Sequence, residues 1–216
     1  MKIKSKKLKI KQQIKTAKKL LRSADCYLQY FIKFPYLGIF HSYPELIHAA
    51  LLEANPEVPN FVPQPMKLHV GNRRYIPDCY YTEYGAKKVV EIKPKGKMEE
   101  KIRITVQEFL KKHKMDFVVI SNEEILEQEQ LGLNWLQIIR VINSGKGIET
   151  KGLELKIMDL FYENNQRTVG DFISQGNRLN KSKMELALYK LIYNHRISFN
   201  ASAGFFNYDT EVELCQ

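Results

Sequence analysis

The order of apolar and polar positions predicts alternating helices and strands over the first part of the chain. Apolar residues recur at helical spacing after Ser42, which stands with Glu45 in the positions of a capping box. Gly71 and Asn72, between two extended segments, are typical of a hairpin turn. The predicted elements are a helix at 42–54, extended segments at 61–70 and 73–84, a strand at 87–94, a helix at 97–114 and a buried parallel strand at 116–121. This α-β-β-β-α-β order predicts an α/β fold that contains a mixed sheet with one crossover.

The last part of the chain has a different pattern, in which helices come first and extended segments last. A helix is expected at 131–142, and three glycines between 143 and 152 indicate a domain boundary. Beyond it we expect helices at 153–164, at 168–176 and, opened by Ser182, at 182–196, then a hairpin between 197 and 209. Three helices followed by a hairpin are the order of a winged helix-turn-helix domain. The expected division is a basic arm at 1–22, an α/β domain at 23–147 and a winged-helix domain at 148–216.

The composition is that of an ordinary globular protein, with 44% hydrophobic and 27% charged residues among 216. No run approaches the roughly 18 apolar residues that a membrane span requires, so no membrane association is expected. Cys26, Cys79 and Cys215 are far apart and lack metal-binding spacing, which is typical of reduced thiols in a cytosolic protein. No uninterrupted apolar stretch follows the basic start of the chain, and a secretory signal is therefore not expected.

The net charge of +10 is concentrated in the first 22 residues, which hold ten lysine and arginine residues and no acidic one. Because the rest of the chain carries 24 residues of each sign, the arm is predicted to bind a polyanion such as DNA. The alternatives are a solvated tail and a membrane-surface helix, which the lack of Trp and Phe disfavours. The spacing of Ile10, Ile14, Ala17 and Leu21 predicts that part of the arm is an amphipathic helix. The lysines expected to contact DNA are Lys4, Lys6, Lys7, Lys9 and Lys11.

The strand predicted at 87–94 carries two charges among apolar neighbours. Alternation along a strand places Glu91 and Lys93 on one face and Ile92 on the other. Burying both charges costs several kcal/mol per ion unless they pair with each other or meet a metal. The pattern therefore indicates either a structural ion pair or a functional site.

Asp78, which follows Pro77 in the preceding extended segment, favours a functional site. Its carboxylate and that of Glu91 can converge on one hard cation, Mg²⁺ or in its place Mn²⁺, and the main-chain carbonyl of Ile92 adds an oxygen. Lys93 would orient or deprotonate an attacking water and balance the charge of a phosphate. These parts are what metal-dependent hydrolysis of a phosphodiester needs. The predicted catalytic residues are Glu45, Asp78, Glu91 and Lys93.

Several other polar residues have two interpretations each. Glu45 either touches a second metal ion or its waters, or it only caps its helix. Gln64 is either a plain polar group of its strand or a support behind the metal ligands. Lys95 and Lys97, which follow the charged strand, either hold a phosphate or belong to a solvated loop. Glu53 is expected to be a solvated helix residue.

The order of Pro77 and Asp78, followed by Glu91, Ile92 and Lys93, resembles the PD-(D/E)xK motif of nucleases. The triplet by itself occurs in many strands. The predicted elements around it strengthen the resemblance: an upstream helix with a glutamate, a hairpin that carries both halves of the motif, then a helix and a parallel strand. The motif implies a restriction-endonuclease-like fold.

The resemblance extends to four longer stretches, SYPELIHAALLEANPEVPNFVPQP, IPDCYY, VVEIKPKGK and FVVISNEEIL. With the winged-helix pattern behind them, they are similar to the TnsA-type endonuclease subunit of heteromeric, Tn-seven-like transposases, over about residues 40–216. The family's motif residues fall on Glu45, Gln64 with Pro65, Pro77 with Asp78, Glu91 with Lys93 and Pro94, and Asn122 to Ile125.

This resemblance implies an endonuclease domain followed by a winged-helix domain, in the bacterial cytoplasm. The implied activity is hydrolysis of the non-transferred strand at each transposon end during cut-and-paste transposition. The implied partners are the double-stranded DNA of the transposon ends, a strand-transfer transposase subunit and an AAA+ regulator ATPase. The basic arm lies outside the matching stretches, so the resemblance assigns it no role.

The winged-helix pattern favours docking of a protein, and hence of the AAA+ regulator, over direct reading of DNA. The predicted wing from Ala201 to Gly204 has no basic residue, and Glu185 interrupts the lysines of the third helix. Two other functions stay open. One is a stand-alone restriction- or repair-type DNA endonuclease of the same fold, and the other is a catalytically idle nuclease fold that serves as a DNA-binding adaptor.

Overall fold

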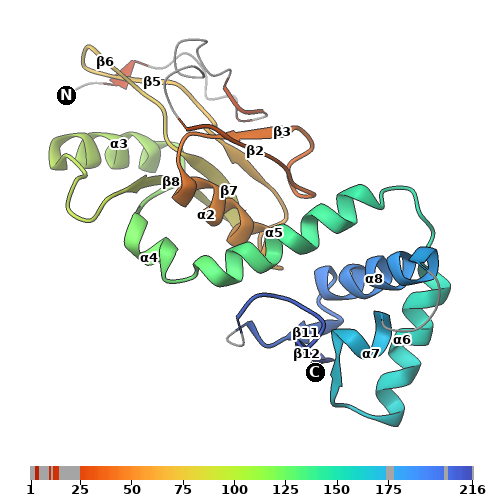
Figure 1. Ribbon diagram of the computed structural model, residues 1–216. Coiled ribbons are helices and arrows are strands. Elements are labelled where there is room, and N and C mark those ends of the chain that lie inside the picture. The colour runs from red at the N-terminus through yellow and green to blue at the C-terminus, as the bar shows by residue number, and fades with distance from the viewer. Residues whose placement is uncertain are drawn as a thin grey trace. The chain divides into compact units, whose positions relative to one another are not determined.

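A computed structural model of the chain describes residues 3–4, 10, 12–14, 25–173, 178–201 and 204–215 (Figure 1). The chain divides into two compact units, residues 1–129 and 130–216. This division falls earlier than the boundary expected at 147/148. Within these described ranges the protein is a mixed α/β protein with seven helices and several small sheets. No helix of the described part is long and apolar enough to cross a bilayer.

The first unit contains the mixed sheet that the sequence predicts. Its strand order is β4-β7-β8-β9, in which β4 pairs with β7 and β7 with β8 in antiparallel fashion, while β8 and β9 run parallel. Helix α3 (Glu100–Lys112) makes the crossover between the two parallel strands. The strand bounds are β4 (Phe61–Pro63), β7 (Cys79–Glu83), β8 (Ala86–Lys93) and β9 (Asp116–Ser121).

Strand β9 is parallel to β8 as predicted, but the prediction that it is buried is wrong. Its residues are exposed or only partly buried, and Val119 keeps 37% of its surface in solvent. The reason is its position, because β9 is the last strand in the order of this sheet and one of its sides is left open. The short apolar run therefore predicted the strand correctly but not the burial of its side chains.

The two extended segments of the sequence are each divided between two sheets. The segment at 61–70 supplies β4 and β5 (Leu68–Val70), and the segment at 73–84 supplies β6 (Arg73–Tyr75) and β7. Strands β5 and β6 form the predicted hairpin, and the two-residue strand β1 (Ile3–Lys4) pairs with β5. The hairpin turn lies at Gly71, whose φ of 61° is one that glycine adopts readily. The two segments thus connect the second sheet, β1-β5-β6, directly to the first sheet.

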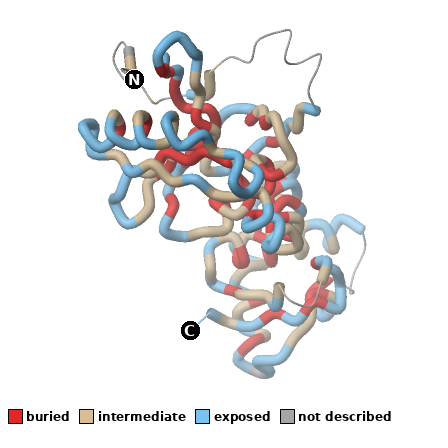
Figure 2. The backbone as a smooth tube through the Cα atoms, turned by 90° about the vertical axis from the view of Figure 1, so that its left-hand side faces the viewer, coloured by how far each residue is buried: buried red, intermediate tan, exposed pale blue. Residues whose placement is uncertain are grey.

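A hydrophobic core joins the two sheets to helix α3. Val106 and Leu110 of this helix are fully buried, and Ile102 and Phe109 pack partly against the same cluster. Buried residues run along the strands of the first unit, whereas much of α3 is exposed (Figure 2). The other members of the cluster are Met66, Leu68, Val70 and Val89, with Ile3 and Ile10 of the basic arm packed against them.

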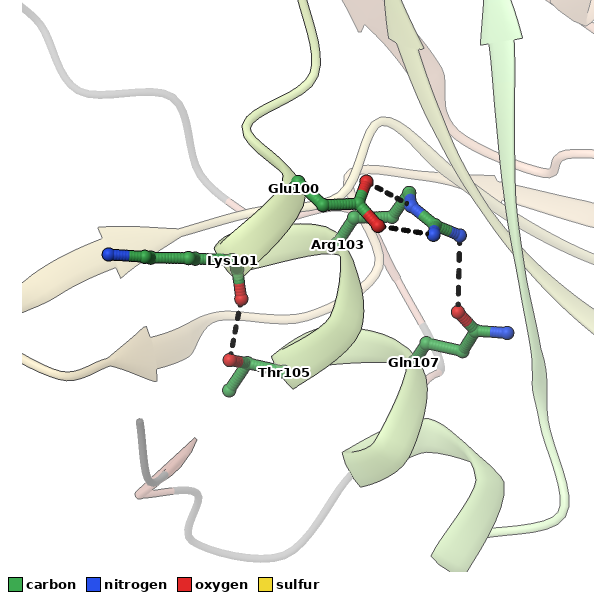
Figure 3. A network of polar contacts seen from close by, with 5 residues as sticks. All are labelled: Glu100, Lys101, Arg103, Thr105 and Gln107. Atoms are coloured by element: carbon green, nitrogen blue, oxygen red, sulfur yellow. Dashed lines mark hydrogen bonds and ion pairs between the residues drawn. The ribbon is translucent and has the colours of Figure 1, made fainter.

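The outer side of α3 is held by contacts between neighbouring turns (Figure 3). Arg103 forms a two-pronged ion pair with Glu100 and also donates to Gln107, and the Thr105 hydroxyl donates to the Lys101 carbonyl. Such exposed pairs stabilise a helix by only a few tenths of a kcal/mol. This surface is therefore a solvated helix face.

Helix α2 (Tyr43–Ala54) begins at Ser42 as predicted, but Glu53 near its end is not solvated as expected. Its side chain is completely buried. Its carboxylate accepts hydrogen bonds from the backbone N–H groups of Ile32 (2.9 Å) and Lys33 (3.1 Å). The Lys33 ammonium in turn donates to the carbonyls of Leu52 and Asn55. Glu53 therefore anchors the bend between β2 (Tyr27–Tyr30) and β3 (Leu37–Phe40) onto α2.

The described part of the basic arm does not show the predicted amphipathic helix. Ile10 and residues 12–14 have no helical conformation, and Ala17 and Leu21 lie outside the described residues. Instead, Ile3 and Ile10 pack on the core of the first unit. The side-chain amide of Gln13 bonds both backbone groups of Ile39, so the arm joins the edge of β3.

The second unit has its elements in the predicted order, but the second strand of the hairpin, expected to end by 209, lies further along the chain at 211–214. Helices α5 (Glu129–Ser144), α6 (Lys151–Glu163), α7 (Val169–Ile173) and α8 (Arg178–Tyr193) precede strands β11 (Ile197–Phe199) and β12 (Glu211–Leu214). A short strand, β10 (Arg167–Thr168), adds to the edge of the hairpin. Ser182 does not open the third predicted helix, because α8 begins earlier and the Ser182 hydroxyl donates back to the carbonyl of Arg178.

Helix α5 packs with the second unit through a buried asparagine and the single tryptophan. Asn134 is 1% exposed, and its amide donates to the Gly204 carbonyl while its oxygen accepts from the Phe206 N–H, both at 3.0 Å. Trp135 lies against the rings of Tyr193 and Phe199. These contacts explain why the division of the chain falls at the start of α5 and not after it.

The burial of His48 on α2 makes a testable prediction about acid stability. Burial lowers the pKa of this histidine from 6.5 to about 4. Between pH 6.5 and pH 4 the unfolded chain binds a proton that the folded chain does not, so the free energy of unfolding falls as the pH falls. At about 1.4 kcal/mol per unit, the loss from this residue is about 3 kcal/mol, and none is added below pH 4.

Urea unfolding of the wild type and of His48→Leu at pH 7, 5.5 and 4.5 measures this effect. The variant is expected to lose less stability across the series than the wild type. His69→Gln, which changes an exposed histidine, should follow the wild type. Parallel pH profiles for His48→Leu and the wild type would contradict the assignment.

Candidate active site

The antiparallel pairing of β7 with β8 brings Asp78 and Glu91 together. Cys79 pairs with Val90, so the next position beyond the strand end places Asp78 opposite Glu91. The backbone continues the ladder there, because the Asp78 N–H donates to the Val90 carbonyl at 2.9 Å. The Ile92 N–H then donates to Asp78 Oδ2 at 2.6 Å, which fixes the direction of this carboxylate. Ile92, predicted to offer its carbonyl to a metal, thus enters the site through its N–H.

Glu91 and Lys93 form an ion pair on one face of β8, as the alternation of the strand requires. Lys93 Nζ lies 2.8 Å from Glu91 Oε1, and the Glu91 side chain is only 3% exposed. Burial by itself lowers the pKa of Lys93, but the carboxylates of Glu91, Asp78 and Glu45 outweigh it and raise that pKa. The ammonium is therefore held in its charged form among three carboxylates.

The same negative surroundings that stabilise the charged form of Lys93 disfavour the charged form of Asp78. Burial raises its pKa well above the usual range, and the nearby charges of Glu91 and Glu45 raise it further, against the Lys93 ammonium and the Ile92 N–H. The charges of Glu91 and Glu45 thus repel the ionised form of Asp78 in the absence of a cation. A bound cation would relieve this repulsion.

Tyr75 is a member of this site that the sequence analysis missed. Its hydroxyl donates to Glu91 Oε2 at 2.6 Å, so both oxygens of Glu91 are engaged by protein donors. Burial, followed by the charge of Glu91, raises the pKa of the Tyr75 hydroxyl. Tyr75 comes from β6 in the other sheet, and nothing in the sequence distinguishes it from Tyr80 or Tyr81 close by.

Glu45 reaches the site from α2 while it also caps that helix. Its Oε1 accepts from the Ser42 hydroxyl at 2.9 Å and its Oε2 accepts from the His41 N–H at 3.1 Å, while Ser42 Oγ accepts from the Glu45 N–H. At the same time its charge is one of those that raise the pKa of Asp78. Glu45 is thus seen to cap its helix and to act on Asp78 through its charge, while contact with a second metal ion or its waters stays a prediction.

Gln64 lies directly behind Asp78 and connects it to other elements. Its N–H donates to the Asp78 carbonyl at 2.8 Å, and its side-chain amide lies 2.7 Å from His41 Nδ1. Its carbonyl accepts from the N–H of Ile14 at 3.1 Å, and Gln13 Nε2 donates to its side-chain oxygen at 3.4 Å. Gln64 is thus more than a plain strand residue, and the arm reaches the site through it.

The predicted DNA-binding lysines are only partly described. Lys95 and Lys97 are exposed on the loop after β8, where the Lys95 N–H donates to Glu123 and the Lys97 N–H to the Pro94 carbonyl. Lys4 lies in β1, and its backbone pairs with β5. The remaining predicted lysines, Lys6, Lys7, Lys9 and Lys11, lie outside the described residues.

The donor set fits a hard divalent cation that keeps much of its water. No three His, Cys, Asp or Glu side chains within the described ranges converge closely enough to hold a metal by themselves. Mg²⁺ does not need such a cage, because it is usually bound by one or two carboxylates together with waters and substrate phosphates. Asp78 and Glu91 are the two side chains that would hold it, and Glu91 would then exchange a protein donor for the cation.

Comparison with models of known protein families and with curated protein sequences gave no match to this chain. The interpretation of the site therefore depends on its own residues and contacts.

The site makes a direct prediction for its three central side chains. Asp78→Ala, Glu91→Ala and Lys93→Ala should each reduce strand cutting about 10²-fold or more, the scale on which loss of a preorganised electrostatic group acts. Arg103→Ala, which breaks the exposed pairs on α3, is the matched control and should keep full activity. The rates are compared on proteins with equal melting temperatures, and near-normal cutting by folded Asp78→Ala would show that this site is not the catalytic one.

The choice of metal can be tested separately. Mg²⁺ and Mn²⁺ should support cutting because the available ligands are hard oxygens, while Zn²⁺ should not be retained without a Cys or His cluster. Elemental analysis of the purified chain, before and after chelation, measures retained metal. Stoichiometric zinc whose removal abolishes activity would contradict this expectation.

Proposed function

We propose that this chain is the metal-dependent DNA endonuclease subunit of a heteromeric transposase, which hydrolyses the non-transferred strand at transposon ends. The first unit would be a restriction-endonuclease-like domain of the PD-(D/E)xK type, and the second a winged helix-turn-helix domain. The observation that carries the proposal is the meeting of Asp78, Glu91 and Lys93 at the ends of two paired strands, with Glu45 within electrostatic reach.

The chemistry follows from the charges of these side chains. A divalent cation held by Asp78 and Glu91 would polarise a phosphate and activate a water molecule. The raised pKa of Lys93 keeps it an ammonium ion, which suits it to orient water and to balance phosphate charge better than to remove a proton. The Ile92 N–H and the Gln64 N–H hold Asp78 in place through its side chain and its carbonyl.

The arm supplies the positive charge that a DNA-binding protein needs. Without its first 22 residues the chain is neutral, and the arm is joined to the first unit at Ile3 and Lys4, at Ile10 and at Gln13 and Ile14. Lysines attached to the catalytic unit give affinity for phosphates but do not read bases. Site choice would then come from a partner.

The second unit supports docking of a protein and not of DNA. Its β11–β12 connection exposes two aromatic side chains, Phe205 (66%) and Tyr208 (61%). The charged residues that accompany them on this connection and on β12 are acidic and exposed, namely Asp209, Glu211 and Glu213. Such a surface repels phosphates and suits a protein partner, for which an AAA+ regulator ATPase is our proposal.

Incubation of the chain with DNA that contains transposon ends, with and without a strand-transfer transposase subunit and an AAA+ ATPase as the proposed partners, tests the proposal. We expect defined nicks near the ends only when the partners are present, and none with Asp78→Ala in the same mixture. Efficient site-specific double-strand cleavage by the chain without partners would instead support a restriction-type enzyme. Normal transposition with Asp78→Ala would indicate an idle, DNA-binding adaptor.

A further inference from the structure

Glu91 is the most enclosed charged group of the candidate active site, and its two oxygens have different partners. Oε1 pairs with the Lys93 ammonium at 2.8 Å, and Oε2 accepts the Tyr75 hydroxyl at 2.6 Å. Lys93 is a long side chain with 41% of its surface in solvent, whereas Tyr75 has a ring packed against the hydrophobic core. The rigid partner of Glu91 is therefore Tyr75.

Tyr75 is held by the sheet that does not contain the catalytic strands. It lies at the end of β6, pairs with Leu68 of β5 and packs against the cluster around Leu68 and Val89. A phenylalanine would fill the same space, so packing does not require the hydroxyl. The role of the hydroxyl is the hydrogen bond that it donates to the carboxylate of Glu91, whose side chain is 3% exposed.

We propose that Tyr75 is a positioning residue, which fixes the orientation of the Glu91 carboxylate so that Glu91 and Asp78 face one cation. Two carboxylates bind one ion tightly only when both point at the same place within a fraction of an ångström. The bond to Oε2 holds the end of a flexible glutamate, and Oε1 would exchange its Lys93 partner for the ion. This inference rests on the proposed function for its metal, but it concerns binding and not cutting.

The test is the affinity of the full-length chain for Mn²⁺, measured by titration calorimetry in the absence of DNA. Tyr75→Phe is expected to weaken Mn²⁺ binding about 10–100-fold, the usual effect of removing a hydrogen bond behind a metal ligand. Tyr80→Phe is the matched control, because Tyr80 is a partly buried tyrosine packed against the same core cluster. It should bind Mn²⁺ like the wild type.

A double-variant comparison separates positioning from a general effect on packing. Tyr75 acts through Glu91, so adding Tyr75→Phe to Glu91→Gln should cause little further loss of Mn²⁺ affinity, while all variants melt within a few degrees of one another. An equal loss in both backgrounds, wild-type affinity of Tyr75→Phe, or no Mn²⁺ binding by the wild type would each overturn the inference. DNA cutting is scored separately, so a chain that binds Mn²⁺ through Tyr75 but never cuts would contradict the proposed function alone.

Discussion

The site depends on one register, the pairing of Cys79 with Val90. It places two carboxylates, Asp78 and Glu91, opposite each other where water is largely excluded, an arrangement that opposes folding. Three donors offset the cost: the Ile92 N–H on Asp78, and the Lys93 ammonium and Tyr75 hydroxyl on Glu91. A shift by one residue would turn Glu91 and Lys93 to the other face and remove the site altogether.

Two buried glutamates in the first unit differ in the kind of hydrogen-bond partner that holds them. This difference suits one to a structural role and the other to a functional role. Glu53 is bound by backbone N–H groups of the bend at Ile32 and Lys33, which cannot leave without unfolding that bend. Glu91 is bound by two side chains, of which Tyr75 is fixed by its packed ring, while the partly exposed Lys93 can move by rotation about single bonds. Only the second arrangement lets a carboxylate exchange a protein donor for an incoming ligand.

Local signals in the sequence were enough to predict much of this. The Ser42 cap, the hairpin turn at Gly71 and the shared face of Glu91 and Lys93 are all present, because each depends on neighbours in the chain. Contacts between distant segments were not predictable in this way. Tyr75 reaches Glu91 from another sheet, Glu53 meets a bend about 20 residues earlier, and Gln13 crosses to β3, so spacing carries no trace of them. The start of α8 was misplaced because Ser182 is not an N-cap. Its hydroxyl donates to the carbonyl four residues before it, inside the helix.

Gln64 connects the basic arm to the candidate active site. Its φ of 45° lies in the left-handed region, which costs a non-glycine residue about 1 kcal/mol or more and persists only where contacts fix it. Here the fixing contacts come from three directions: Asp78 accepts its N–H, Ile14 of the arm donates to its carbonyl, and His41 meets its side-chain amide. The residue that receives the arm at its carbonyl thus also holds Asp78 through its N–H. The strained residue is thus the physical connection between the charged segment of the sequence and the chemistry that it is proposed to serve.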